Sequence, residues 1–414
     1  MTASLARTAA APPATARKRP ARLWWHVHQW VGLKLSLFLS FILLTGTLAV
    51  VSHEIDWALT PSLRVAPSSV PAEPDWAAIG ARALAHPSVE EVRYIAEPTA
   101  SAFAARVMIK RRDGSLGYLH AHPGTGAIQG ETGFVDAQRV LRNLHRHLNL
   151  PTKFGVPIVS ALAFLMLVSL VTSFVVYKKW WRGWLRPIRW RDARTAWGDF
   201  HRLAGLWSLW FLLLITATGV WYFVESMGGA APSSPRVEAP GDAPDRNELA
   251  ASLARGIAAA RAAAPDLRIE SIQLPTEAGD PLVIEGQRSA WLVRPRANAV
   301  SVDPASGAVL LQTDARDLSA HQRISEMADP LHFGTVAGYW TKLPWFLFGL
   351  LLTGLAVSGV AVHALRIGRE LRLPRRAAPL AAAAWRSMGH WRWPAAAAVA
   401  TGLAMLPTLF ASAE

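Results

Sequence analysis

Four histidines recur in two matched sets along this 414-residue chain. His28 and His201 each precede a Gly-Leu pair at +4 and +5 and a Thr-Gly pair at +17 and +18, with a mostly apolar run between them. His145 and His332 each follow a leucine and stand 12 residues before a proline. Equivalent residues of an internal two-fold repeat can meet across its pseudo-symmetry axis. The spacing therefore predicts two pairs, His28 with His201 and His145 with His332.

Paired imidazoles at the ends of apolar runs favour one chemistry. Ionisable residues in membrane segments are functional candidates by default. Neutral imidazole is a good axial ligand for haem iron, and two axial histidines give a low-spin haem that transfers electrons. Facing helices of a bundle commonly supply such ligands. We therefore expect about two non-covalent haem b groups, one on each side of the membrane. His53 and His363 are second-choice ligands because they lack counterparts in the other repeat.

Other histidines support weaker hypotheses. A histidine near a helix end can simply anchor the helix at the membrane interface, and this alternative stays open for each residue taken singly. His26 and His147 each lie two residues from a predicted ligand, about 200° around a helix, and are expected to point elsewhere. His120 and His122 would share one face of a strand, where they form a minor candidate for a metal site.

The apolar runs are long enough to cross a bilayer. Hydrophobic residues make up 51% of the chain, which also contains 19 Trp, unlike a typical soluble enzyme. Small residues within the runs, such as Thr45-Gly46 and Thr218-Gly219, are expected to allow close helix packing. We predict four spans and a weaker fifth, which could instead lie in the interface; they cover about 29–52, 155–177, 203–224, 343–365 and 393–413.

The basic residues that give the formal charge of +14 gather beside the spans, so this charge does not predict a nucleic-acid partner. Basic residues gather in 1–22, 178–194 and 366–392. Because cytoplasmic loops carry an excess of Lys and Arg, these three segments are expected in the cytoplasm. The chain would then cross a bacterial inner membrane several times, with its polar domains in the periplasm. Since cysteine is absent, iron–sulfur clusters and covalently attached c-type haem are excluded.

Two polar segments repeat one pattern of elements. In the first, a helix at 76–85 precedes β-rich runs at 89–95, 102–110 and 116–122; in the second, a helix at 247–264 precedes runs at 267–274, 281–285 and 290–293. Each is expected to pack one helix on a small antiparallel sheet. The predicted order is a disordered basic N-terminus (1–22), first span (23–53), polar domain (54–144), second span with its entry (145–177), basic loop (178–200), third span (201–225), polar domain (226–331), fourth span with its entry (332–366), basic linker (367–392) and fifth span (393–414).

These motifs and their order along the chain resemble those of the PepSY-associated transmembrane helix family. The resemblance covers about 23–367 and rests on the His-x-x-x-Gly-Leu entries, the Leu-His before spans two and four, the exit His53-Glu54-Ile55-Asp56 and the turn Asp303-Pro304-Ala305-Ser306-Gly307. His122 stands where the family often has Asp in the first polar domain. The resemblance implies an α-helical membrane protein with a four-helix core and two PepSY-like extracytoplasmic domains. Relatives include inner-membrane haem proteins that reduce ferric siderophores during iron uptake.

Residues and resemblance together predict a di-haem electron-transfer protein that reduces a ferric siderophore or similar ferric complex. No Gly-rich dinucleotide motif follows a strand, so a quinol or a separate cytoplasmic reductase would supply electrons. Two alternatives stay open: a haem-free PepSY protein that binds a peptide or regulates a peptidase, and a transporter for an iron complex. Distance is a difficulty, because roughly 24 residues of straight helix beyond His28 would span about 36 Å. The haems must therefore lie inward of the helix ends, or a further group must lie between them.

Overall fold

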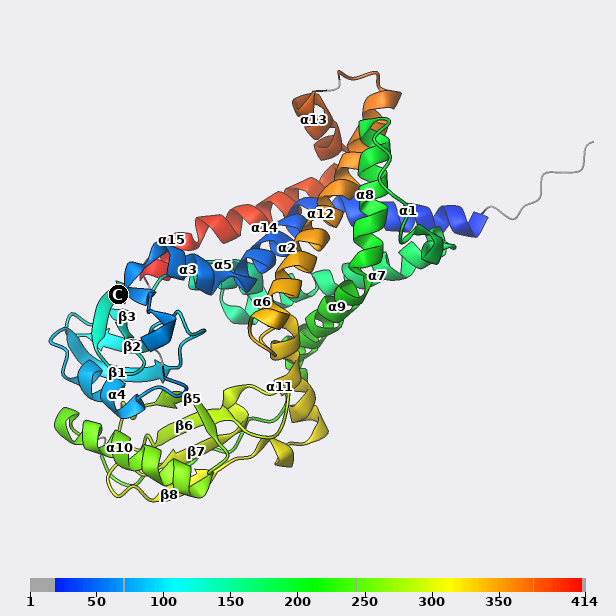
Figure 1. The fold of residues 1–414 in the computed structure, drawn as a ribbon. Helices are drawn as coiled ribbons and strands as arrows, with labels where there is room; N and C mark the ends of the chain where they lie inside the picture. The colour runs from blue at the N-terminus through cyan, green and yellow to red at the C-terminus, as the bar shows by residue number, and fades with distance from the viewer. Residues whose placement is uncertain (1–18, 70, 243, 375, 412–414) are drawn as a thin grey trace, which may run out of the picture.

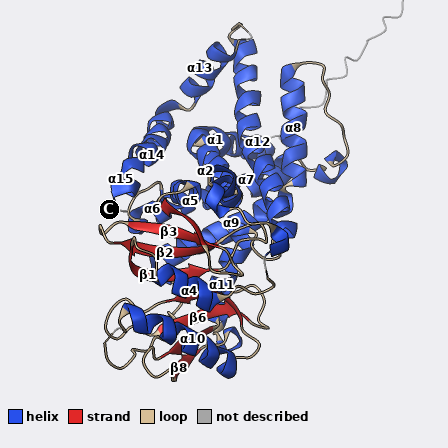
Figure 2. Ribbon diagram, turned by 60° about the vertical axis from the view of Figure 1, so that its left-hand side comes forward, coloured by secondary structure: helices blue, strands red, loops and turns tan. Residues whose placement is uncertain are grey.

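The computed structural model describes residues 19–69, 71–242, 244–374 and 376–411. Figure 1 shows a bundle of long helices on one side and a β-sheet on the other, and Figure 2 shows two helices lying along the sheet. The predicted disordered N-terminus (1–22) lies outside the described residues up to residue 18, and residues 19–22 are instead part of a helix. The combination of membrane helices with an antiparallel sheet confirms the predicted fold class.

The helical region contains four helical segments that are long and apolar enough to cross a membrane, counted over the described residues. These are 152–176, 209–229, 339–370 and 389–411, so the weaker C-terminal span also meets the criterion. They comprise α6 (Thr152–Ser160), α7 (Leu162–Val176), α9 (Leu209–Val224), α12 (Tyr339–Glu370), α14 (Arg392–Ala404) and α15 (Leu406–Ala411). The helices α8 (Ala193–Trp207) and α13 (Ala377–Ser387) precede two of them.

The first predicted span is not one straight helix. It consists of α1 (Arg19–Lys34) and α2 (Ser36–Val50), which bend by 65° where they meet. The bend comes where the sequence changes from a helix with Arg, His and Lys to one that is almost wholly apolar. Lys34 donates a hydrogen bond to the carbonyl of Ser387 at 2.7 Å, which fixes the end of α1 against α13.

The sheet has eight antiparallel strands in the order β4-β3-β2-β1-β5-β6-β7-β8. They are β1 (Val89–Ala96), β2 (Ala105–Arg111), β3 (Leu116–Ala121), β4 (Ile128–Gly133), β5 (Arg268–Gln273), β6 (Leu282–Gln287), β7 (Ala299–Val302) and β8 (Val309–Gln312). Three strands, β4, β7 and β8, were not expected. The run at 290–293 is not a strand, since Leu292 adopts a left-handed backbone with φ of 59°.

The two polar segments share one sheet instead of forming two separate ones. The strands β1 and β5 pair at the centre, where Ile95 faces Ile272. Pairing these strands removes two exposed edges, which would otherwise present unpaired backbone groups. A single buried cluster contains residues of both halves, including Ile95 and Ile272.

The helices α4 (Trp76–Leu84) and α10 (Arg246–Ala263) also pack on each other. A Cβ built on Gly80 of α4 would lie 2.0 Å from the Cδ2 atom of Leu253 on α10, so a larger residue here would force the leucine side chain to move. Leu253 is fully buried, and truncating such a side chain costs roughly 2–5 kcal/mol.

Two short helices connect the sheet to the membrane helices and carry one predicted histidine each. They are α5 (Ala137–His147), which precedes α6, and α11 (Ala320–Phe333), which precedes α12. The carboxylate of Asp56, on α3 (Ser52–Leu59), accepts hydrogen bonds from the first two backbone N–H groups of α5. A capping box of Ser319 and Gln322 begins α11. Capping of this kind satisfies the unpaired donors of a helix start and fixes its direction.

Candidate functional site

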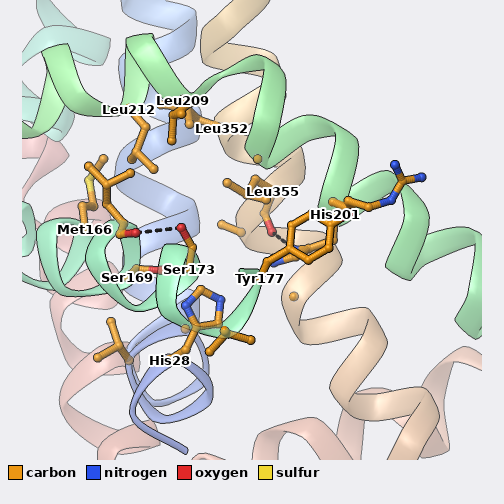
Figure 3. Close-up of a pocket in the computed structure, with 18 of the residues that line it drawn as sticks. His28, Met166, Ser169, Ser173, Tyr177, His201, Leu209, Leu212, Leu352 and Leu355 are labelled. Carbon is orange, nitrogen blue, oxygen red and sulfur yellow. Dashed lines mark hydrogen bonds between the residues drawn. The ribbon is translucent and has the colours of Figure 1, made fainter. Parts of the chain in front are cut away.

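The structure brings His28 and His201 together on the side of the bundle far from the sheet. His28 lies on α1 and His201 on α8, and their ring centres are 6.4 Å apart. Both line a cavity of about 320 Å³ (Figure 3). Its other labelled lining residues are mostly apolar side chains of α7, α9 and α12, including Met166, Leu212 and Leu355.

His145 and His332 form the second pair, at the sheet side of the bundle. Their ring centres are 6.1 Å apart, with an angle of 38° between the ring planes. Both line a larger cavity of about 580 Å³. The two pairs are those that the internal repeat predicts; that they bind haem stays a prediction.

Backbone carbonyls orient one histidine of each pair. The Nδ1 atom of His145 lies 2.9 Å from the carbonyl oxygen of Ile42 on α2. The Nδ1 atom of His201 lies 3.1 Å from the carbonyl oxygen of Leu355 and 3.0 Å from the hydroxyl of Ser358, both on α12. A carbonyl only accepts, so Nδ1 carries the proton in both rings and Nε2 keeps its lone pair.

Threonine hydroxyls orient the other two rings. The Nδ1 atom of His28 lies 3.0 Å from the Oγ1 atom of Thr172, and that of His332 lies 2.7 Å from the Oγ1 atom of Thr218. Each hydroxyl also donates to a backbone carbonyl of its own helix. Because a hydroxyl has one proton, each threonine accepts from its imidazole, and Nδ1 is again the donor.

All four rings are therefore held at Nδ1, while Nε2 forms no hydrogen bond to any residue that the structure describes. This is the arrangement by which proteins prepare histidine as a metal ligand. An imidazole nitrogen binds a transition metal at about 2 Å, so two axial imidazoles on one iron hold their ring centres about 6 Å apart. The separations of 6.4 and 6.1 Å fit that requirement. The residues of both cavities thus fit a haem between each pair.

Glycine makes room for these rings. A Cβ on Gly46 would lie 2.5 Å from the Cε1 atom of His145, and a Cβ on Gly359 would lie 3.3 Å from that of His201. The Thr-Gly motif was expected only to bring helices close together. Gly46 instead borders a candidate ligand, and Thr218 orients another. The recurrence of Thr-Gly at +17 and +18 was the available signal for both residues.

The second-choice ligands do not join either pair. His53 and His363 are absent from the lining of both cavities. The Nδ1 atom of His363 accepts a hydrogen bond from the side-chain amide of Gln29 at 2.8 Å. His26 and His147 likewise line neither cavity, as their helical positions predicted.

The structure does not form the metal site for which His120 and His122 were a minor candidate, weaker than a plain surface strand. Both ring nitrogens of His120 are engaged, Nδ1 with the hydroxyl of Ser62 and Nε2 with that of Thr132. His122 lies beyond the end of β3 and contacts the hydroxyl of Ser69. The strand ends between the two histidines, so each finds separate partners. Across the described residues, no three His, Asp or Glu side chains form a cluster that could hold a metal ion.

The two cavities are neighbours. Leu39 and Leu43 of α2 and Met166 of α7 line both of them. The estimate of about 36 Å assumed a straight first span, but the bend at Leu35 takes His28 out of line with α2. In addition, His145 contacts Ile42 and Gly46 well inside α2. The two histidine pairs therefore line adjoining cavities that share three lining residues.

A polar cluster that the sequence did not reveal borders His332. The ring of Tyr222 lies 5.2 Å from that of His332, and its hydroxyl donates to the Oδ1 atom of Asp329 at 2.6 Å. The other oxygen of Asp329 pairs with Arg294 at 2.9 Å. Arg294 lies in the connection between β6 and β7, so the sheet region reaches the second histidine pair directly.

The family model for the PepSY-associated TM region matches residues 25–366. The chain belongs to this family. Among curated proteins, none matches it. The matched residues include all four paired histidines and the whole sheet. The chain is thus a multi-pass membrane protein of this family.

Proposed function

We propose that this PepSY-associated protein is a di-haem b electron-transfer protein of the bacterial inner membrane, which reduces a ferric siderophore or similar ferric complex on the periplasmic side. The observation that carries the proposal is the common orientation of the four histidines. Each ring is held at Nδ1, and each pair has the separation that two axial ligands need. Bound haem would supply one-electron transfer.

The protein's own residues would hold and separate the two groups. His28 and His201 would bind the haem at the far side, and His145 and His332 the haem at the sheet side. Leu39, Leu43 and Met166 would form the apolar wall between them and keep water out. Exclusion of water and a low dielectric are levers by which a protein sets a haem's potential.

The position of the basic segments supports a direction for electron transfer. The basic segments 178–194 and 366–392 flank the helix ends far from the sheet, and such segments remain in the cytoplasm. The far-side pair would then receive electrons from a quinol or a cytoplasmic reductase. The sheet-side pair, with its larger cavity, would pass them to the ferric complex in the periplasm.

Rapid mixing tests this activity. Dithionite-reduced protein in nanodiscs is mixed without oxygen with a ferric siderophore, and a ferrous-specific chelator reports the product. We expect oxidation of the protein with formation of Fe(II) at one equivalent per electron lost. Reduced protein that contains haem but delivers no electron to any ferric complex would contradict the proposed reductase activity.

A further inference from the structure

The mouth of the sheet-side cavity carries an excess of positive charge. Five cationic side chains line it: Arg142, Arg146, Lys153, Arg294 and Arg296. Two of them are neutralised, since Arg294 pairs with Glu326 and Asp329 and Arg296 pairs with Glu326. The other three form no ion pair or hydrogen bond with any residue that the structure describes.

These three cations come from adjacent elements. Arg142 and Arg146 flank His145 on α5, and Lys153 lies in the first turn of α6. All three side chains are exposed. Partial burial and the neighbouring charge of Arg146 lower the pKa of Arg142, and the carboxylate of Asp329 offsets part of that effect. An anion bound at this place would relieve that repulsion.

The positive charge around His145 is not repeated around His332, its equivalent in the other half of the internal repeat. Where α5 has Arg142 and Arg146 around His145, α11 has Asp329 and Phe333 around His332. Asp329 is already engaged by Tyr222 and Arg294. Symmetric binding of a cofactor between two equivalent histidines gives no reason for this asymmetry.

Haem propionates alone do not account for three free cations. On the proposed function, the far-side cavity holds the same porphyrin, yet its one lining cation is Arg202. Arg202 is held by Asp199 and by backbone carbonyls that include that of Arg186. The sheet-side cavity also has nearly twice the volume of the far-side cavity, about 580 against 320 Å³.

We propose that Arg142, Arg146 and Lys153 form the recognition site for an anionic ferric chelate, one that presents carboxylate or catecholate oxygens next to His145 and His332. This inference rests on the proposed function and names its substrate class. Arginine offers two parallel N–H donors to a carboxylate, and the lysine adds a point charge. A haem held by His145 and His332 would supply the one electron that reduces Fe(III) of the chelate to Fe(II), and this reduction needs no proton transfer and no change of bonds.

The site can be tested by binding, without any electron transfer. Gallium(III) has the charge of Fe(III) but is not reduced under these conditions, so gallium citrate serves as the anionic probe and gallium desferrioxamine B as the cationic probe. Affinities are measured by calorimetry on the full chain in phosphatidylcholine nanodiscs, where anionic headgroups do not compete. The variants are Arg142→Gln, Arg146→Gln and Lys153→Gln, each singly. Arg82→Gln is the matched control, because Arg82 is an exposed cation on α4 that does not line this cavity.

We expect each cavity substitution to weaken gallium citrate binding about tenfold, since a charged hydrogen bond of this kind contributes roughly that factor. Binding of the cationic probe should be unchanged or stronger, and Arg82→Gln should bind both probes as the unaltered protein does. Affinity for gallium citrate should also fall as salt is added.

Two results would overturn the site. One is that the cavity substitutions weaken binding of both probes equally, or weaken binding of neither probe. The other is that the variants lose the sheet-side haem, while the variant molecules that retain this haem bind gallium citrate with normal affinity. In that case the three cations would serve the haem propionates alone. Unaltered protein that contains no haem but binds gallium citrate through these residues would refute the proposed function and leave the anion site standing.

Discussion

Gly46 lies directly against the ring of His145. A Cβ at this position would approach the Cε1 atom of the ring to 2.5 Å, far inside van der Waals contact. The ring is fixed from its other side by the hydrogen bond between its Nδ1 atom and the carbonyl of Ile42, so it cannot easily retreat. The absence of a side chain at Gly46 is thus part of the candidate sheet-side site.

Gly46→Ala should displace His145 and disturb the sheet-side haem while the far-side haem stays intact. Overpacking of this kind costs about 1–3 kcal/mol. The expected readout is loss of one low-spin signal by electron paramagnetic resonance. Gly133→Ala is the control, because a Cβ there meets nothing within 4 Å. If Gly46→Ala keeps both low-spin signals unchanged, His145 is not placed as described.

Thr218→Val should weaken binding of the sheet-side haem. The substitution removes the acceptor that holds Nδ1 of His332, and loss of such a partner commonly costs 10–100-fold in metal affinity. Thr408→Val is the control, since the hydroxyl of Thr408 bonds to the backbone carbonyl of Met405 and Thr408 lines neither cavity. Titration of each apoprotein with haem measures the difference. Equal affinities in the two variants would refute the role of Thr218.

Asp329→Asn should raise the midpoint potential of the sheet-side haem. The substitution removes a negative charge one helical turn from His332, and that charge favours the more positive ferric state. We expect a shift on the order of 60 mV, which corresponds to about tenfold in the redox equilibrium. Spectroelectrochemical titration resolves the two haems. Asp317→Asn controls for net charge; if both substitutions shift the potential equally, the effect is not local to Asp329.

The sequence was sufficient to predict the histidine pairs because the repeat marks them at matched intervals. The sequence was not sufficient to predict the bend at Leu35. The apolar run lies on one side of the bend, and the bend itself depends on packing against α13. The joining of β1 to β5 depends on strands about 175 residues apart, which local patterns do not report. Thr172 is recognisable only once α7 is packed against α1, because its role depends on where its hydroxyl meets His28.

His120 should make the sheet sensitive to mild acid. Burial, aided by the positive charge of Arg106, lowers its pKa from 6.5 to about 4. The unfolded chain therefore binds more protons between these pH values, and the free energy of unfolding falls as the pH drops from about 6.5 to about 4. The loss is roughly 3 kcal/mol at most.

Thermal unfolding of the full chain across this pH range measures the effect of His120. The variant His120→Gln keeps a polar group near Ser62 and Thr132. Its stability should fall less steeply with decreasing pH, because the contribution of His120 protonation is removed. Identical pH dependence in both proteins would show that His120 does not contribute.

The absorption spectrum of the purified protein tests the central claim, that two histidine pairs each hold one haem. We predict about two low-spin haem b groups per chain, with a Soret band that shifts and sharpens on reduction by dithionite. The double variant His28→Ala with His201→Ala should keep only the sheet-side haem, and His145→Ala with His332→Ala only the far-side haem. A spectrum without a Soret band, or either double variant with both low-spin haems, would contradict the account.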